Sequence, residues 1–189
     1  MIALPYPLLS DHLTIVLVGL PGSGKSTVGR QLARRLGVPF IDSDHVIEER
    51  LGCSIREFFE REGEARFRDI EQDTLNELSQ GPAAVLSTGG GACMREATRT
   101  FLKARGQVIY LRSTPEDIYR RIRHDRGRPL LLVADPLQRL RDLYEARDPQ
   151  YRECAHYVVE TGRPSVATLV NMIVMQLELA GALPESMPR

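Results

Sequence analysis

The sequence predicts an α/β fold of three layers, in which a five-stranded parallel sheet lies between two layers of helices. Three observations support it. Five short apolar runs alternate along the chain with segments of helical spacing, which is typical of a parallel sheet covered on both faces. The length of 189 residues suits one such domain and is too short for two full domains. No internal repeat or linker divides the chain, so we expect a single domain.

The five expected strands are short apolar runs. In chain order they cover residues 13–18, 38–41, 83–87, 107–111 and 156–159. The first leads straight into a glycine-rich loop, the second stops at Asp42, and the third stops at a run of three glycines. Because parallel sheets bind ligands outside the carboxyl ends of their strands, we expect a site where these three strands end.

The expected helices are recognised by apolar spacing and by the residues at their ends. In chain order they cover residues 27–36, 43–51, 54–78, 95–104, a segment that opens at Thr114, and 165–179. The first has Val28, Leu32 and Leu36 at helical intervals. The third is expected to break near Gly63. Thr114 is followed by a proline and two acidic residues, the usual opening of a helix.

Both ends of the chain are expected to lie outside the domain, which we place at residues 13–180. Residues 1–12 form a leader that is partly apolar but contains two prolines and lacks the basic start of a signal peptide. The leader is also far too short to span a bilayer. Residues 181–189 contain two prolines and are expected to form a frayed C-terminal tail.

Charge and cysteine content argue against several kinds of partner. The chain carries 25 basic and 25 acidic residues, so its net charge favours neither nucleic acid nor an anionic membrane surface. Its three cysteines are odd in number and widely spaced, which argues against a disulfide framework and favours a reducing, cytoplasmic location. The sequence has no CxxC pair and no histidine cluster, and therefore gives no indication of a structural zinc site.

A complete phosphate-binding loop follows the first strand. Residues 19–26 read Gly-Leu-Pro-Gly-Ser-Gly-Lys-Ser, and a helix is expected directly after them. In such a loop, backbone N–H groups and the positive end of the helix converge on phosphate. Lys25 can reach the β- and γ-phosphates, and Ser26 can ligate Mg²⁺. A chance glycine-rich turn is the alternative, but the strand–loop–helix order favours a site for a nucleoside triphosphate.

Two carboxylates and a glycine triplet follow the next two strands. Asp42 and Asp44 are two residues apart, so their side chains point the same way if the strand geometry persists. One can hold metal-bound water, and the other can accept a proton from an attacking hydroxyl. The alternative is that they cap the following helix, which is compatible with substrate binding. The triplet Gly89–Gly91 lets the backbone approach a small ligand closely, although a simple turn stays open.

Several arginines are candidates for binding a small anionic substrate. A carboxylate is best held by guanidinium groups, which donate two parallel hydrogen bonds. The candidates are Arg66, Arg68, Arg128 and Arg147. Any one of them, taken alone, is more readily explained as a solvated surface arginine.

Together these motifs resemble the shikimate kinase family. The resemblance rests on the phosphate loop, Asp42-Ser-Asp44, Phe67-Arg68, Gly89–Gly91, Arg128-Pro-Leu-Leu131 and Arg147-Asp-Pro-Gln-Tyr151, in this order over nearly the whole chain. It implies a P-loop NTPase fold like that of the nucleoside monophosphate kinases, with a mobile lid at about residues 121–134. It also implies ATP- and Mg²⁺-dependent transfer of the γ-phosphoryl group to the 3-hydroxyl of shikimate, a step of aromatic amino-acid biosynthesis.

The resemblance further implies roles on the side of the phosphoryl donor. Lys25 and Arg128 would neutralise charge on the transferring group, with Arg128 carried by the lid. Ser26 would ligate Mg²⁺, and Asp42 would hold the metal through water. The residues expected to bind ATP are Gly22, Ser23, Gly24, Lys25, Ser26, Thr27, Arg123 and Arg128. Arg123 is our choice for stacking on adenine, and Arg121 is the alternative.

On the acceptor side, the resemblance implies that Asp44 binds the shikimate hydroxyls and is the candidate proton acceptor. Arg68 and Arg147 would bind the carboxylate, and Gly90 would donate its backbone N–H to the same ligand. The expected catalytic residues are therefore Lys25, Asp44 and Arg128. We expect a monomer that binds ATP and shikimate and binds neither nucleic acid nor membrane.

Two other functions are weighed against this one. A kinase for gluconate or for a nucleoside monophosphate would share the loop and an acidic residue after the second strand. The elements Phe67-Arg68 and Arg128-Pro-Leu-Leu131 count against it. A nucleotide-sensing regulatory module would normally be joined to an effector domain, and 189 residues leave no room for one.

Overall fold

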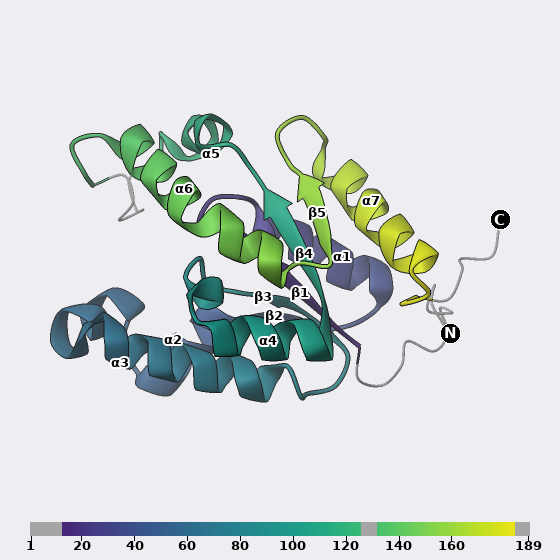
Figure 1. Ribbon diagram of the computed structural model, residues 1–189, viewed down its shortest axis with the longest axis horizontal. Helices are drawn as coiled ribbons and strands as arrows, with labels where there is room; N and C mark the ends of the chain where they lie inside the picture. Colours follow the sequence, from purple (N-terminus) through teal and green to yellow (C-terminus); the bar gives the residue numbers. More distant parts are fainter. Residues whose placement is uncertain (1–12, 126–131, 184–189) are drawn as a thin grey trace.

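The five predicted strands form one parallel sheet in the computed structural model, which describes residues 13–125 and 132–183. The strands are β1 (Thr14–Val18), β2 (Phe40–Asp42), β3 (Ala84–Ser87), β4 (Gly106–Arg112) and β5 (Tyr157–Glu160). Their order is β2-β3-β1-β4-β5, and all neighbouring strands are parallel. β1 is therefore the central strand (Figure 1). The predicted α/β fold class is confirmed.

Helices connect the strands, and all but one of the long ones were expected. They are α1 (Lys25–Leu36), α2 (Ser43–Leu51), α3 (Ile55–Leu78), α4 (Glu96–Arg105), α5 (Pro115–Ile122), α6 (Pro136–Cys154), α7 (Val166–Leu179) and a 3-10 turn, η1 (Ala92–Met94). Helix α6 was not predicted from the sequence. Pro149 lies inside this helix, and proline removes a backbone hydrogen bond, so the segment resembles a loop in sequence.

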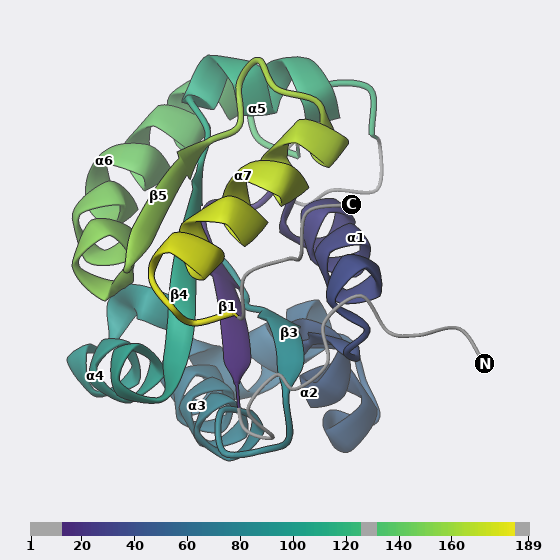
Figure 2. The ribbon, with the colours of Figure 1, turned by 90° about the vertical axis from the view of Figure 1, so that its right-hand side faces the viewer.

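Alternate residues along β1 face two different layers of helices. Ile15 and Leu17 pack in one core with α1 and α7, whereas Val16 and Val18 pack in a second core with α3, α4, α5 and α6. Figure 1 shows α4 and α6 over one face of the sheet, and Figure 2 shows α1 and α7 over the other. The apolar runs are continuous because both faces of the sheet are buried.

Helix α3 contains the break that the sequence predicts. Gly63 has φ 83° and ψ 168°, a conformation outside the helical region that glycine adopts readily. The helix opens with a capping box, in which the Ser54 side chain accepts from the Glu57 N–H and the Glu57 carboxylate accepts from the Ser54 N–H. A small third core of Ile47, Phe58 and Phe67 joins α2 to α3.

Residues 181–183, which were expected to belong to a frayed tail, pack against the end of α7. Ala182 and Leu183 donate their N–H groups to the Leu177 carbonyl, and Gly181 has φ 69°. This left-handed glycine closes the end of α7 and turns Leu183 back into the core, where the side chain is 2% exposed. Residues 1–12 and 184–189 and the segment 126–131 of the predicted lid lie outside the described residues. No helix among residues 13–125 and 132–183 is long and apolar enough to cross a membrane.

Candidate active site

The loop after β1 has the backbone shape that phosphate binding requires. Gly22 and Gly24 have φ 82° and 97°, in the left-handed region that favours glycine. A Cβ atom on Gly19 would lie 2.7 Å from the Leu111 carbonyl oxygen, so a larger residue does not fit there. Helix α1 then begins at Lys25 without a side-chain cap on its first N–H groups. These donors and the positive end of the helix are available to an anion.

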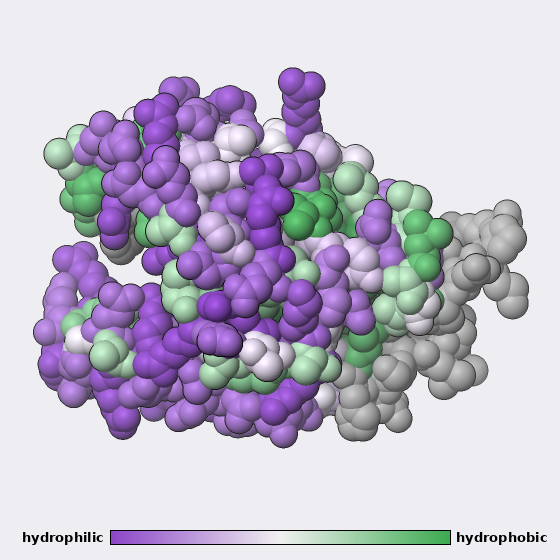
Figure 3. Space-filling view, in the orientation of Figure 1, coloured by the Kyte–Doolittle hydropathy of each residue, from purple (hydrophilic) through white to green (hydrophobic). Residues whose placement is uncertain are grey.

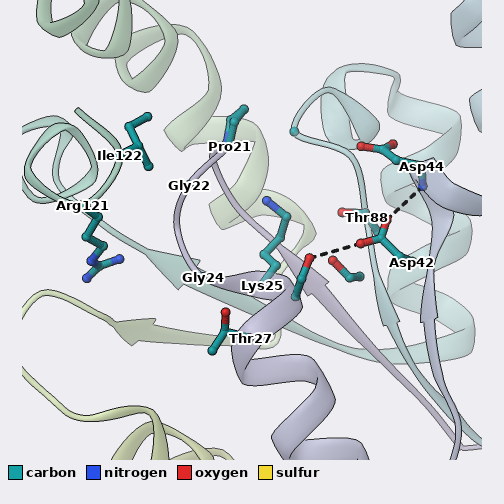
Figure 4. Close-up of a pocket in the computed structure, with 13 residues that line it drawn as sticks. Pro21, Gly22, Gly24, Lys25, Thr27, Asp42, Asp44, Thr88, Arg121 and Ile122 are labelled. Carbon is teal, nitrogen blue, oxygen red and sulfur yellow. Dashed lines mark hydrogen bonds between the residues drawn. The ribbon is translucent and has the colours of Figure 1, made fainter. Parts of the chain in front are cut away.

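Three strand ends meet at a cavity of about 420 Å³ above this loop, as the sequence analysis expected. Its lining comes from the loop and α1, from the end of β2 and the start of α2, from the end of β3 and the residues after it, and from α5. The residues are Pro21, Gly22, Gly24, Lys25, Ser26, Thr27, Asp42, Asp44, Ser87, Thr88, Gly90, Arg121 and Ile122. Figure 4 shows the Lys25 and Asp44 side chains directed toward the same space from opposite sides. We call this space the loop cavity.

Lys25 is the buried cation of the loop cavity. Its side chain curls over the loop, and Nζ donates to the carbonyls of Gly19 at 2.8 Å and Leu20 at 3.0 Å. The residue is only 8% exposed. Burial lowers the pKa of Lys25 to about 8, and the carboxylates of Asp44 and Asp42 oppose this shift. Without a bound anion, burial therefore disfavours the protonated form of Lys25.

Asp42 both caps α2 and faces the phosphate loop. Its Oδ1 accepts from the backbone N–H of Asp44 at 3.1 Å, and its Oδ2 accepts from the Ser26 hydroxyl at 3.1 Å. Asp42 therefore caps α2 and also lies in the site, two roles that are compatible in one residue. A hydroxyl beside a carboxylate is the hard oxygen donor set that suits Mg²⁺ carried in by a nucleotide. These residues therefore fit the metal that the sequence implies.

Asp44 is a half-buried carboxyl group at the edge of the loop cavity. Burial raises the pKa of Asp44 to about 6, with further contributions from the carboxylates of Glu71 and Asp42. Lys25 acts in the opposite direction. A carboxyl group with such a pKa is ionised at neutral pH and can take up a proton easily.

A second cavity of about 620 Å³ adjoins Asp44 on its other side. Its lining comes from α2, from the start of α3 and from the residue that follows the undescribed lid segment. The residues are Asp44, Glu48, Ser54, Ile55, Arg56, Phe59 and Leu132. Figure 3 shows the molecule hollowed on its left side, between the start of α6 and the first half of α3. Asp44 thus lies between the phosphate loop and a space where a small molecule can bind.

Arg68 is held toward the glycine triplet by two carboxylates. Its Nη1 donates to Glu71 at 2.6 Å, and its Nη2 donates to Glu64 at 2.9 Å. Burial alone would lower the pKa of Arg68, but Glu71 and Glu64 outweigh it and raise the pKa. Glu71 itself is only 3% exposed. A Cβ atom on Gly91 would overlap the Arg68 guanidinium, so the glycine makes room for it.

Glu71 and Glu64 were missed by the sequence analysis. The signal was present, because residues three and four positions from Arg68 on one helix lie beside it. Arg66, in contrast, is exposed on α3, where its Nη1 lies 3.9 Å from Asp69 Oδ2. Of the two neighbouring arginines, Arg68 is the one that the fold brings to the site.

Arg147 reaches the glycine triplet from α6. Its Nη1 donates to the carbonyl oxygen of Gly90 at 3.0 Å. The Tyr151 hydroxyl, one helical turn further on, donates to the same oxygen. Gly90 was expected to donate its N–H to a ligand, which stays a prediction, and its carbonyl accepts from Arg147 and Tyr151. Arg68 and Arg147 therefore both lie beside the triplet, and their binding of a carboxylate stays a prediction.

A third cavity, of about 210 Å³, lies on the far side of the phosphate loop. Ser23, Gly24, Thr27, Val28, Arg121, Thr161, Pro164, Val166 and Leu169 line it. Arg121 donates to the carbonyl of Thr161, and Figure 4 shows it beside the loop. Arg123 is exposed at the end of α5 and lines neither this cavity nor the loop cavity. The geometry therefore favours Arg121 over our first choice for the nucleotide. Arg128 lies outside the described residues.

The fold and the site define a kinase of the P-loop class that acts on a small molecule. A family model described as shikimate kinase matches residues 21–178. The shikimate kinase of Paracidovorax citrulli is 61% identical over 178 residues, covering 93% of this chain and 97% of its own. This chain belongs to the shikimate kinase family.

Solved structures agree with this assignment. The shikimate kinase from Acinetobacter baumannii in complex with shikimate has a TM-score of 0.83 and 49% identity, covering 90% of this chain and 96% of its own. A gluconokinase from Sinorhizobium meliloti has a TM-score of 0.59 at 20% identity, over 90% of this chain and 94% of its own. That likeness shows the shared fold alone.

Proposed function

We propose that this protein transfers the γ-phosphoryl group of ATP to the 3-hydroxyl of shikimate, giving shikimate 3-phosphate and ADP. One observation carries the proposal. Asp44 lies between the phosphate loop with Lys25 and a second cavity, and two arginines converge on the adjoining glycine triplet. Such a site combines a phosphoryl donor, a hydroxyl acceptor and a carboxylate anchor.

The donor half of the site binds and orients the triphosphate. The N–H groups at the start of α1 and the Lys25 ammonium face the phosphates. Ser26, and Asp42 through water, would hold Mg²⁺, which would neutralise charge on the phosphates. Pro164 and Arg121 line the cavity beside the loop, and we assign the adenine to it. Arg128, on the predicted lid, would add a second cation at the transferring group.

The acceptor half positions the attacking hydroxyl. Asp44 accepts its hydrogen bond and takes the proton as the new P–O bond forms. Arg68 and Arg147 bind the carboxylate through charge-assisted hydrogen bonds. Glu71 fixes the direction of Arg68, which reduces the entropy lost when the ligand binds.

The release of ADP with different acceptors tests the proposal. Shikimate, gluconate and AMP are offered separately with ATP and Mg²⁺, and shikimate should be the one that gives rapid turnover. No turnover with shikimate would show that the proposal is wrong. Turnover with gluconate or AMP alone would support one of the competing kinases.

Replacing Arg68 by alanine should mainly weaken the binding of shikimate. Loss of one charge-assisted contact of about 1.5–3 kcal/mol raises KM for shikimate by about 10- to 100-fold. The kcat value should change less, because the carboxylate is remote from the transferred group. Steady-state kinetics with ATP saturating measure both constants. The control is Arg66→Ala, two residues away and exposed; an unchanged KM in Arg68→Ala would exclude Arg68 from carboxylate binding.

Replacing Gly89 by alanine should disturb Asp44 directly. The added Cβ would lie 2.6 Å from Asp44 Oδ1 and 2.8 Å from Glu71 Oε1, so at least one carboxylate has to move. A displacement of about 1 Å at a reacting group can cost about 100-fold in rate, so we expect kcat/KM to fall by about 10- to 100-fold. Gly81→Ala, whose Cβ would approach no atom closer than 3.3 Å, serves as the control. Wild-type kinetics in Gly89→Ala would show that the position of Asp44 is not critical.

Two earlier expectations stay predictions. The monomeric state can be measured by light scattering of the purified protein. The cytoplasmic location rests on the number and spacing of the cysteines, of which Cys93 and Cys154 are buried and free and Cys53 is partly exposed and free.

A further inference from the structure

Tyr151 and Arg147 share one acceptor, the carbonyl oxygen of Gly90. They lie four residues apart on α6, so both project from the same face of the helix. Arg147 Nη1 donates to this oxygen at 3.0 Å, and the Tyr151 hydroxyl donates to it at 2.5 Å. The middle residue of the glycine triplet is therefore held by two donors at once.

The Tyr151 side chain is built into the core and delivers only its hydroxyl to the site. The residue is fully buried, and its ring packs against Tyr110 with 5.0 Å between ring centroids. Burial raises the pKa of Tyr151, so the hydroxyl is a neutral donor throughout the working pH range. The aromatic ring could pack in the core without a hydroxyl group. The hydrogen bond to Gly90 therefore indicates a specific role for the Tyr151 hydroxyl.

Gly90 lies close to both the phosphate loop and α6. A Cβ atom there would lie 2.8 Å from Pro21 Cδ of the phosphate loop and 3.3 Å from Arg147 Nη1. The triplet is thus enclosed between the phosphate loop and α6. Gly90 is partly buried, so the loss of both donors to its carbonyl would be unfavourable.

A separate set of contacts anchors α6 to the sheet. Asp148 accepts from the Tyr110 hydroxyl at 2.8 Å and from Arg112 Nε at 3.1 Å, both on β4. It also accepts from Arg152 Nε at 2.6 Å. The placement of the helix therefore does not depend on the Tyr151 hydroxyl, whose effect should be local to the glycine triplet.

We propose that Tyr151 is a positioning residue that holds the Gly90 carbonyl, so that Arg147 is free to turn to the substrate carboxylate. The inference rests on the proposed function. Arg147 donates here to a neutral carbonyl, and a carboxylate is the stronger acceptor for a guanidinium. When Arg147 turns to the ligand, Tyr151 keeps the Gly90 oxygen paired. Without the hydroxyl, the release of Arg147 would leave that oxygen unpaired, so binding of shikimate would be weakened.

The variant Tyr151→Phe tests the inference by steady-state kinetics. It keeps the ring against Tyr110 and removes only the hydroxyl. We expect KM for shikimate to rise by about 5- to 20-fold, as loss of a hydrogen bond of about 1–2 kcal/mol predicts. The values of kcat and of KM for ATP should stay within about two-fold, which a general loss of structure would not produce. Tyr144→Phe is the matched control, since its hydroxyl contacts Arg112 rather than Gly90.

A double-mutant cycle with Arg147→Ala shows whether Tyr151 acts through Arg147. The ratio kcat/KM at low shikimate is measured for both single variants and the double variant, with thermal unfolding recorded for each. We expect Tyr151→Phe to cost less than about two-fold when Arg147 is already absent. An equal cost in both backgrounds, or an unchanged KM in Tyr151→Phe, would overturn the inference. Failure of the wild-type protein to phosphorylate shikimate would instead overturn the proposed function.

Discussion

Replacing Lys25 by methionine should lower kcat by about 100- to 1000-fold, the usual cost of removing one preorganised group that stabilises charge in a transition state. Lys25 is the buried cation at the base of the loop cavity, and its Nζ rests on the carbonyls of Gly19 and Leu20. Charge is redistributed on the γ-phosphoryl group during transfer. The Lys25 ammonium therefore stabilises the transition state more than it stabilises bound ATP. The measurement is kcat with both substrates saturating.

The same variant should leave shikimate binding and folding nearly unchanged. Methionine is unbranched, apolar and shorter than lysine by only the terminal group, so it removes a buried charge without creating a large cavity. KM for shikimate is expected to stay within about three-fold of the wild-type value, because the Lys25 ammonium faces the phosphates and does not bind the acceptor. Lys103→Met, at an exposed position on α4 whose Nζ donates to the Glu153 carbonyl, should behave as wild type. A kcat within two-fold of wild type in Lys25→Met would exclude Lys25 from the transfer step.

The elements that could be predicted from the sequence are those whose apolar spacing matches the residues that are buried in the fold. The apolar run of β1 and the glycines after it define a strand, a loop and a helix start without any help from distant residues. The break at Gly63 was predictable for the same reason, because a glycine with positive φ is a local event. Helix α6 was missed although Leu140, Leu143 and Tyr151 recur at helical spacing. Pro149 inside the helix is a local signal against it, and the hydrogen bonds from β4 to Asp148 that hold the helix join residues far apart in the chain.

The candidate site shows the same division. Lys25, Ser26, Asp42 and Asp44 follow strand ends, so the topology of a parallel sheet was enough to bring them together. The groups that orient them were not found, because they depend on which side chains meet in space. Glu71 beside Arg68 and Tyr151 beside Gly90 are examples. The choice between Arg121 and Arg123 likewise depends on which side of α5 faces Thr161.

Replacing Asp44 by asparagine should lower kcat by about 100- to 10,000-fold, which is the usual contribution of a proton acceptor in the transition state. The amide keeps the size of the side chain and can still bind a hydroxyl, but it cannot take the proton. If Asp44 only orients the hydroxyl, the loss should be about ten-fold or less. The size of the loss in kcat at pH 7.5 therefore distinguishes the two roles. A variant with wild-type kcat would remove Asp44 from the mechanism.

The pH dependence of the wild-type enzyme gives an independent test. Asp44 has to be ionised to accept a proton, so kcat/KM at low substrate concentrations should rise as the pH passes its pKa of about 6. Lys25 has to be protonated, so activity should fall again as the pH passes about 8. Asp44→Asn should lose the acidic limb and keep the alkaline one. A wild-type profile that is flat between pH 5 and 7 would contradict this assignment of Asp44.

Stability should change in the direction opposite to activity. The pKa of Asp44 is raised by burial from 3.8 to about 6, so between these values the native state binds more protons than the unfolded state. The free energy of unfolding therefore decreases as the pH rises through this window, and at neutral pH the ionised carboxylate destabilises the fold. Asp44→Asn should consequently melt at a higher temperature than wild type at pH 7.5, and the difference should disappear near pH 4. If Asp44→Asn is inactive and melts at a higher temperature, the activity is lost because the carboxylate is missing. If it melts at a lower temperature at neutral pH, the loss of activity is explained by misfolding.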